Sequence, residues 1–496
     1  MPDPLAQLES RLEEIEDLEA LTGLLAWDQR TIMPPAGALI RGRHRGLLER
    51  LAHEKLIDPE IGRLLDQLPL DSFDPDSDEA GLLRLARRNY EKAVQVPPEL
   101  TAEMARAAAE AASVWVEARA TSNFSRFLPS LERNLELKRR YVACFEPRAE
   151  LYDVLLDDFE PEMRSAEVRR IFDEIKPVLA ALAAEQRERD VDDSCLTGDF
   201  PVERQRQLSE EIVSLFGLRE GTWRLDPTEH PFQSGAGVDD IRITTYYDPR
   251  SVDSLFATMH EFGHALYENQ IPHRFAHLPI GTGASFGLHE SQSRLWENLV
   301  GRSLPFWRFW YPRVQELFPE QLGDIEVEHF HAAVNKVQPS LIRIHADEVT
   351  YGMHVILRFE LEQEMIEGRV ELSDLPQRWN EKMDEYLGVE VPDDARGVLQ
   401  DMHWSDGLIG YFSTYLLGTV MSVQIWDAAE RDLPDLEERI ERGDFAPLRE
   451  WLGEHVHALG RKFAPQETLR RATGSTIDAR PYLDYLRRKF GAAVPA

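Results

Sequence analysis

The stretch Thr258-Met259-His260-Glu261-Phe262-Gly263-His264-Ala265-Leu266-Tyr267 sets two histidines four residues apart, with a glutamate directly after the first. On an α-helix, residues four apart project from one face, so both imidazoles can bind one metal ion while Glu261 reaches the water that the ion activates. This HExxH pattern therefore predicts a helix that carries a metal-dependent hydrolytic site.

The residues around this motif favour a helix. Asp253 and Ser254 can cap its start. Gly263 is a weak helix former that costs roughly 1 kcal/mol relative to alanine, and it could instead admit a close neighbour. An apolar side is supplied by three residues, Leu255, Met259 and Leu266.

Length and composition indicate a large globular protein. The 496 residues are 43% hydrophobic and 29% charged, which provides ample material for a core. We expect one continuous domain over residues 1–496, rather than two or three separate domains. Within it, residues 1–125 would form N-terminal helices that could act as a lid, and residues 126–496 would form the catalytic helices and a small sheet.

The charge balance excludes several classes of function. Lys and Arg total 56 against 89 Asp and Glu, for a net charge of -33, which would repel nucleic acid and anionic lipid. No apolar run approaches about 18 residues, so we expect no membrane span. The two cysteines form no CxxC pair and the first residues lack a secretion signal, so we expect a cytoplasmic protein.

Hydrophobic periodicity predicts a mainly α fold. Apolar residues recur three and four apart over residues 5–120, 127–187 and 202–216, and helix returns after the HExxH motif. Between residues 217 and 250, the segments Trp223–Leu225 and Ile241–Tyr247 alternate and carry β-branched and aromatic residues. We therefore expect a small hairpin or sheet just before the HExxH helix.

A zinc site of this kind usually has a third protein ligand. The extended HExxHxxGxxH pattern is excluded, because Tyr267 and Gln270 stand where it needs glycine and histidine. Glu268 is also unsuitable, since it would lie about 12 Å along the helix axis from His260. His273 and His277 lie in a loop that begins with a proline, and they stay open as alternatives.

Glu290 is the favoured third ligand. It lies in His289-Glu290-Ser291-Gln292-Ser293-Arg294-Leu295-Trp296-Glu297-Asn298, whose spacing suits a second helix that packs against the first. Glu297, two turns later, is the competing candidate. The preceding segment, residues 281–287, lacks the third glycine of GxGxxG and a preceding strand, so it predicts a turn and not a dinucleotide-binding loop.

With these residues in hand, the chain resembles the Taq carboxypeptidase family of zinc-dependent metallocarboxypeptidases. The resemblance is spread over much of the sequence and follows the order of that family's motifs. Besides HEFGH, it rests on Trp27-Asp28-Gln29, His230-Pro231-Phe232, Asp240-x-Arg242-x-Thr244, His289-Glu290-Ser291-Gln292-Ser293, Ile342-Arg343-x-x-Ala346-Asp347 and Gly397-x-x-Gln400-Asp401-x-His403-Trp404.

The resemblance implies a large helical peptidase fold with a deep central groove, removal of C-terminal amino acids from peptides, and a homodimer. It implies His260, His264 and Glu290 as metal ligands and Glu261 as general base. The metal would be Zn²⁺, although such ligands also accept Co²⁺ or Mn²⁺.

The resemblance also implies residues that contact the substrate. Arg343 would receive the terminal carboxylate, a task for which Arg242 also qualifies by residue type. His403 and the segment with Tyr411 and Tyr415 would line the reacting centre, where a neutral donor helps stabilise the oxyanion. Relatives carry proline where this chain has Ser413, which puts the two tyrosine positions in question.

Two other functions compete with a carboxypeptidase. HEFGHALY also resembles the thimet-type oligopeptidases, which cleave within peptides, although their third-ligand region differs from HESQS. A helical binding protein with a purely structural HExxH is the non-enzymatic alternative. The sequence does not identify the preferred terminal residue, because a pocket collects side chains from distant segments.

Overall fold

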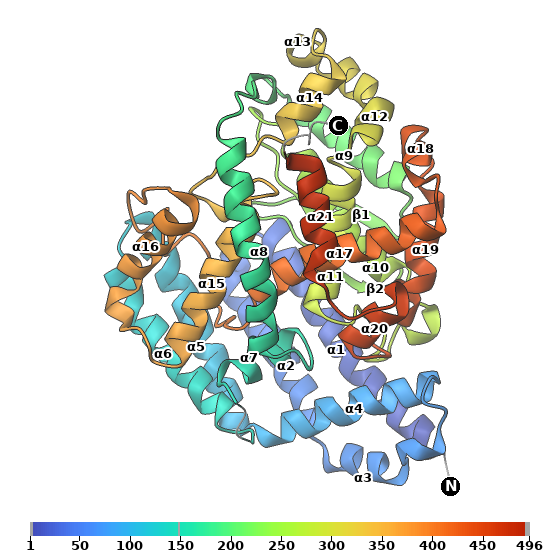
Figure 1. Cartoon of the computed structure of the whole chain (residues 1–496). Helices are drawn as coiled ribbons and strands as arrows, with labels where there is room; N and C mark the ends of the chain where they lie inside the picture. Colours follow the sequence, from blue (N-terminus) through green and yellow to red (C-terminus); the bar gives the residue numbers. More distant parts are fainter. Residues whose placement is uncertain (1–2, 147–148, 492–496) are drawn as a thin grey trace. The chain divides into compact units, whose positions relative to one another are not determined.

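The computed structural model describes residues 3–146 and 149–491, which divide into two compact units. Within the described residues, the first unit comprises 3–94, 192–334 and 421–477, and the second comprises 95–146, 149–191, 335–420 and 478–491. The described chain is mostly helical with one small sheet, as its sequence predicts (Figure 1). None of its helices combines the length and hydrophobicity that a membrane span requires.

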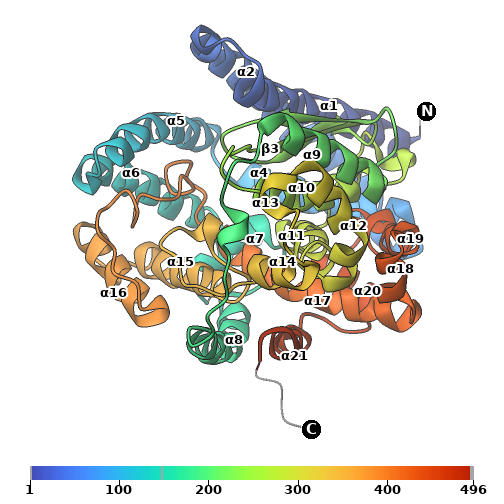
Figure 2. The ribbon, with the colours of Figure 1, turned by 90° about the horizontal axis from the view of Figure 1, so that it is seen from above.

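The helices of the first unit begin at or near the capping residues and prolines in the sequence. Asp3 accepts a hydrogen bond from the backbone nitrogen of Leu5 at the start of α1, and Figure 2 shows α1 and α2 side by side. The helices are α1 (Pro4–Thr31), α2 (Ala38–Leu56), α3 (Pro59–Gln67), α4 (Asp78–Gln95), α9 (Val202–Phe216), α10 (Ser254–Asn269), α11 (Phe286–Arg294), α12 (Leu304–Leu317), α13 (Pro319–Leu322), α14 (Val327–Val334), α18 (Leu436–Glu441), α19 (Ala446–His455) and α20 (Pro465–Thr473).

The second unit is helical in the residues that the structure describes. Its α5 and α6 lie side by side (Figures 1 and 2). The helices are α5 (Pro98–Ala120), α6 (Phe124–Val142), α7 (Tyr152–Phe159), α8 (Ser165–Gln186), α15 (Tyr351–Ile366), α16 (Leu375–Leu387) and α21 (Ala479–Phe490), while α17 (Ser413–Asp432) contributes residues to both units.

The small sheet has one strand more than the sequence pattern indicates. β1 (Trp223–Pro227) and β3 (Asp240–Thr245) match the two expected segments, but they pair in parallel rather than as a hairpin. β2 (Gln233–Gly237) pairs antiparallel with β3, so β3 lies in the middle. Its sequence, QSGAG, lacks the β-branched and aromatic residues that usually mark a strand.

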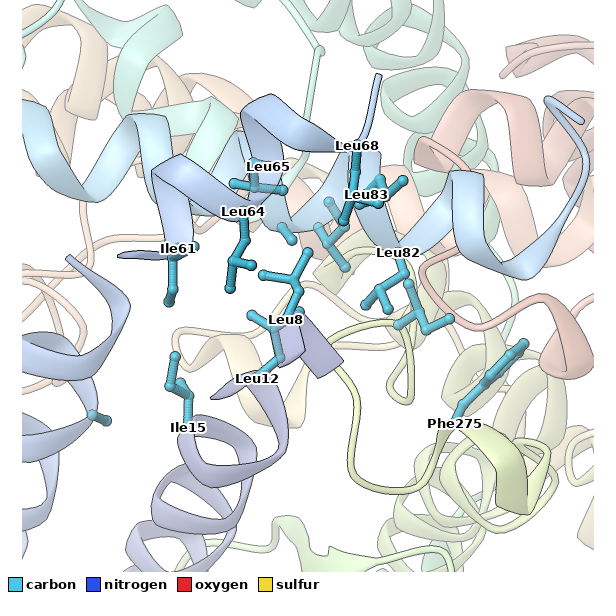
Figure 3. Close-up of a cluster of buried hydrophobic side chains, with 14 of the residues drawn as sticks. Leu8, Leu12, Ile15, Ile61, Leu64, Leu65, Leu68, Leu82, Leu83 and Phe275 are labelled. Atoms are coloured by element: carbon cyan, nitrogen blue, oxygen red, sulfur yellow. The ribbon is translucent and has the colours of Figure 1, made fainter. Parts of the chain in front are cut away.

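One hydrophobic cluster of the first unit joins its N-terminal helices. Leu8, Leu12 and Ile15 are three or four residues apart, so they share one face of α1. Figure 3 shows this face opposite leucines of α3 and α4, with Phe275 beside them. The buried side chains labelled there are Leu8, Leu12, Ile15, Ile61, Leu64, Leu65, Leu68, Leu82, Leu83 and Phe275.

The helix that carries the HExxH motif, α10, is fixed by polar as well as apolar contacts. The hydroxyl of Thr258 lies 3.1 Å from that of Ser209 on α9 and 3.2 Å from that of Thr245 on β3. Leu255, Met259 and Leu266 are buried, as the sequence predicts. Asp253 does occupy the N-cap position, but its side chain makes no capping hydrogen bond.

Gly263 allows α11 to approach α10 very closely. A Cβ atom at residue 263 would lie 2.3 Å from the carbonyl oxygen of Gln292 and 2.5 Å from the Cα of Ser293. Both are backbone atoms, so no side-chain rotation can relieve the clash. The glycine that weakens the helix therefore admits a close neighbour, and it brings the Glu290 region of α11 against the histidines of α10.

We predict that Gly263→Ala destabilises the protein by about 1–3 kcal/mol or more, because overpacking outweighs the better helix propensity of alanine. Gly42→Ala is the matched control. Gly42 is an exposed residue of α2 whose added Cβ would meet nothing within 4 Å, so alanine there should be neutral or stabilising. Thermal denaturation measures both changes, and equal midpoints for the two variants would contradict the close approach of α10 and α11.

Candidate metal centre and substrate-binding residues

His260, His264 and Glu290 bring their ligand atoms together within the first unit. One ligand atom from each residue lies within 4.8 Å of the others. Oε2 of Glu290 is 3.6 Å from Nε2 of His260 and 3.5 Å from Nε2 of His264. Ligands about 2.0–2.1 Å from a tetrahedral zinc ion lie roughly 3.3 Å apart. The three side chains therefore fit a single divalent ion.

Glu297 contacts the other nitrogen of His260. Its Oε2 lies 2.9 Å from Nδ1 of that histidine, so Nδ1–H donates and Nε2 is left to face Glu290. Metal-binding histidines commonly have such a carboxylate partner. Asp240 instead accepts two hydrogen bonds from Arg242.

Arg294 links the two carboxylates of this helix. Its Nε donates to Oε1 of Glu290 at 2.7 Å, and its Nη1 donates to Oε2 of Glu297 at 3.1 Å. Glu290 and Glu297 are seven residues apart, so they project from nearly the same helix face. α11 continues here as a π-helical turn, Leu295–Val300. The Arg294 contact leaves Oε2 of Glu290 directed at the histidines.

The surroundings favour the protonation states of a metal site in Glu290 and His264. For His260, burial acts to lower the pKa, but the Glu290 and Glu297 carboxylates raise it overall. Burial alone would raise the pKa values of Glu290 and Glu297, but both lie well below the usual range. Arg294 and the two histidines lower the pKa of Glu290, and Arg294, His260 and Arg302 lower that of Glu297. Burial lowers the pKa of His264 to about 4, so its ring is neutral at pH 7. Metal binding needs ionised carboxylates and neutral imidazoles, so Glu290 and His264 are prepared for it.

Glu261 is in a different electrostatic environment. Its residue is only 6% exposed, and burial raises its pKa to about 7, although the neighbouring His260 acts in the opposite direction. Glu290 and Glu297 raise the pKa further. Among these three carboxyl groups, Glu261 is therefore the one that can gain and lose a proton near neutral pH.

Arg343 lies in a buried charge cluster of the second unit. Its Nε and Nη2 donate to Oδ1 of Asp401 at 3.1 and 3.0 Å, and Asp401 also accepts from Nε of Arg358 at 2.6 Å. The Arg343 guanidinium lies 4.8 Å from the centre of the Tyr415 ring. Two arginines thus share one carboxylate, which leaves one positive charge in this group.

His403, Tyr411 and Tyr415 also lie together. Nε2 of His403 is 3.0 Å from the hydroxyl of Tyr415, and the Tyr411 ring centre is 5.4 Å from that of His403 and 5.2 Å from that of Tyr415. Ser413 is the first residue of α17. Proline is common at the first position of a helix, and the helix begins here with serine in place of the proline that the family resemblance implies.

Arg242 is placed differently from Arg343. It belongs to the first unit, where it pairs with a single carboxylate, Asp240, and lies 4.1 Å from the Trp27 ring centre. Its charge is therefore compensated one for one.

Comparisons with known proteins point to one family. The family model described as carboxypeptidase Taq (M32) metallopeptidase matches residues 7–490. The chain belongs to this family. It is 43% identical over 507 residues to thermostable carboxypeptidase 1 of Thermus thermophilus, and the match covers 99% of each chain. It is 35% identical to carboxypeptidase 1 of Bacillus subtilis, over 97% of this chain and 96% of the relative.

Solved structures of the M32 family share the fold. The M32 carboxypeptidase of Deinococcus radiodurans R1 superposes with a TM-score of 0.94 at 39% identity, covering 98% of this chain and 99% of that one. Trypanosoma cruzi metallocarboxypeptidase 1 gives 0.93 at 31% identity, with 99% of each chain covered. The M32 chain is therefore a metallocarboxypeptidase, a peptide hydrolase, and its family implies a divalent metal. The thimet-type alternative is not favoured.

Some of these contacts between site residues could be predicted from sequence spacing, and others could not. Arg294 could have been linked to Glu290 by its i+4 position on a predicted helix. The ion pairs of Asp401 with Arg343 and Arg358 have no such spacing in the sequence, because loops and helices separate the three residues. The contacts of Glu362 likewise cannot be predicted from sequence spacing.

Glu362 anchors the segment that carries His403. Its carboxylate accepts hydrogen bonds from the Tyr152 hydroxyl at 2.7 Å, from Nε1 of Trp404 at 3.0 Å and from the backbone nitrogen of Gly410 at 3.1 Å. Burial nevertheless raises the pKa of Glu362 to about 7, against the lowering effect of these donors.

The raised pKa of Glu362 predicts a pH-dependent stability. The folded protein keeps the Glu362 proton up to about pH 7, whereas an unfolded carboxyl group loses it near 4.5. The contribution of Glu362 to the free energy of unfolding is therefore fully present below pH 4.5 and is lost as the pH rises through about 7. We predict that wild type loses about 2–3 kcal/mol more unfolding free energy between pH 5 and pH 8 than Glu362→Gln.

Denaturant titration at the two pH values measures this difference. Glu110→Gln, an exposed substitution on α5, is the control and should follow wild type. A Glu362→Gln variant with the wild-type pH dependence would contradict the protonated, buried state of Glu362.

Proposed function

We propose that His260, His264 and Glu290 hold one divalent metal ion, Zn²⁺ in preference to Co²⁺ or Mn²⁺. The observation that carries this proposal is the convergence of two imidazole nitrogens on one carboxylate oxygen, at 3.5 and 3.6 Å. Two histidines and one glutamate match the ligand sets of catalytic zinc sites, which keep a position open for water. Such an ion supplies Lewis-acid activation of water and of a peptide carbonyl.

Glu261 acts as the general base in this proposal. Its carboxylate takes one proton from the attacking water as the water oxygen bonds to the scissile carbonyl carbon. It then passes this proton to the amine nitrogen as the carbon–nitrogen bond breaks, so the carboxylate is regenerated. Its burial and its pKa of about 7 suit both the acceptance and the release of a proton.

Arg343 receives the free C-terminal carboxylate of the peptide. Arg343 and Arg358 share only Asp401, so the group has one positive charge that a substrate carboxylate would neutralise. Burial strengthens this attraction, because water does not screen it fully. Arg242 fits the role less well, since Asp240 already balances its charge.

His403, Tyr411 and Tyr415 supply neutral hydrogen-bond donors for the oxyanion. Burial lowers the pKa of His403 to about 3, so its ring is uncharged at neutral pH. Its contact with the Tyr415 hydroxyl orients both groups.

The substrates in this proposal are peptides with a free C-terminus. We also infer a homodimer in the cytoplasm, supported by the family resemblance and by the composition. Nucleic acid is an unsuitable partner, because the net charge is -33.

We predict that Glu261→Gln lowers kcat at least about a hundredfold, because the amide cannot accept the water proton. Its zinc content should remain that of wild type, since Glu261 is not a ligand here. Glu290→Gln is the matched comparison and should lose both activity and zinc. Metal analysis alongside peptide hydrolysis checks this; wild-type turnover in Glu261→Gln would contradict the role as general base.

We predict that wild type cleaves a peptide with a free C-terminus at least about 30-fold faster, in kcat/KM, than the same peptide amidated, because the amide cannot form an ion pair with Arg343. Arg343→Met should remove most of this preference. Arg242→Met is the matched control and should retain it. Equal rates of wild type on the two peptides would contradict carboxypeptidase action, and an unchanged preference in Arg343→Met would contradict the role of Arg343.

A further inference from the structure

Two residues outside the ligand set form a chain of hydrogen bonds to His264. Nδ1 of His264 lies 2.6 Å from Nδ1 of His289, and Nε2 of His289 lies 2.7 Å from Oε1 of Glu268. Glu268 is on α10, one turn beyond His264, and His289 is on α11, directly before Glu290. Both residues therefore belong to the two helices that carry the ligands.

The direction of each hydrogen bond follows from the acceptor at the end of the chain. An ionised Glu268 can only accept, so Nε2 of His289 must carry a proton. Glu268 thereby favours the His289 tautomer in which the lone pair on Nδ1 accepts from Nδ1–H of His264. His264 consequently has its own lone pair on Nε2, the nitrogen that lies 3.5 Å from Oε2 of Glu290.

Glu268 is itself held in place by the turn before α11. Oε1 of Glu268 also accepts from the Thr282 hydroxyl at 3.1 Å and from the backbone nitrogen of Gly283 at 3.2 Å. These donors favour the charged carboxylate, and burial alone would disfavour it; the pKa of Glu268 is lowered overall. The turn at residues 281–287 thus helps to hold the Glu268 carboxylate in place.

The His289 ring has little freedom to move. A Cβ atom at Gly283 would lie 2.6 Å from Cδ2 of His289, and the Tyr267 ring centre is 5.2 Å from that of His289. Tyr267 is fixed in turn by stacking on His457 and by a hydrogen bond from the backbone nitrogen of Ala284. Packing therefore holds the His289 ring in the orientation in which it contacts both Glu268 and His264.

We propose that Glu268 and His289 are positioning residues that fix the tautomer and ring orientation of His264 for a divalent metal ion. This inference rests on the ligand set proposed above. The two ligating histidines then have different partners. His260 contacts the Glu297 carboxylate directly, whereas His264 contacts an imidazole that is itself held by the Glu268 carboxylate.

Loss of Glu268 has a specific consequence for the tautomer. Without its acceptor, His289 is free to carry its proton on Nδ1 and to donate toward His264. The proton of His264 would then move to Nε2, where it competes with the ion. Removing Glu268 should therefore weaken metal binding, even though Glu268 is not a ligand.

Binding of Zn²⁺ and Co²⁺ to the apoprotein, measured by chelator competition, tests this inference. We expect His289→Gln and Glu268→Leu to lower affinity about 10–100-fold. His289→Asn can keep an acceptor near the Nδ1 position, so it should lose less metal affinity than His289→Gln. Glu268→Gln keeps an uncharged acceptor, so it should lose less affinity than Glu268→Leu. The visible absorption of bound Co²⁺ should shift in His289→Gln. His273→Gln, at an exposed histidine paired with Asp239, should bind within twofold of wild type.

Wild-type affinities and unchanged Co²⁺ spectra in His289→Gln and Glu268→Leu would overturn the inference. The inference would also be overturned if His273→Gln lost as much metal affinity as those variants. The same holds if His289→Asn lost as much affinity as His289→Gln, and Glu268→Gln as much as Glu268→Leu. Thermal denaturation of the apoproteins shows which variants fold. If His289→Gln does not fold, the metal affinities of Glu268→Leu and Glu268→Gln decide between the same outcomes. His264→Ala separates the two proposals, because retained affinity there would refute the ligand set, whereas lost affinity there with normal Glu268→Leu would refute only the positioning role.

Discussion

The candidate metal centre depends on the close approach of α10 and α11 at Gly263. The carbonyl oxygen of Gln292 and the Cα of Ser293 occupy space that any side chain at residue 263 would need. This approach places one carboxylate on α11 opposite two imidazoles on α10. The polar contacts of Thr258 fix α10 against α9 and β3, so the histidines are presented by a rigid element.

Buried charge is the second organising feature of this unit. Glu261, Glu290 and Glu297 are carboxyl groups in one small region, together with Arg294 and two histidines. Repulsion between like charges and burial would normally raise all three pKa values. Arg294 instead contacts Glu290 and Glu297 and keeps them ionised, whereas Glu261 makes no such contact and has a pKa of about 7. One arginine thus separates carboxylates suited to binding from a carboxyl group suited to proton transfer.

Much of this arrangement could be predicted from sequence. Helix α9 spans Val202–Phe216 as its periodicity predicts, and Glu290 lies on a second helix against the first. Strand β2 could not be predicted, because its glycines and serine carry no strand signal and its pairing with β3 is a tertiary contact. Likewise, sequence spacing alone makes Glu297 a competing candidate for the third ligand. Glu297 instead contacts Nδ1 of His260. That contact depends on how the two helices are rotated relative to each other, which cannot be read from the spacing of residues along one helix.

The central claim is that two histidines and Glu290 form one metal site, with their outer nitrogens held by the protein. A crystal structure of zinc-loaded protein, with anomalous data at the zinc edge, tests it most directly. The account predicts one anomalous peak about 2.0–2.2 Å from Nε2 of His260, Nε2 of His264 and a carboxylate oxygen of Glu290. A zinc ion bound through Nδ1 of either histidine, or lying more than about 4 Å from Glu290, would contradict it.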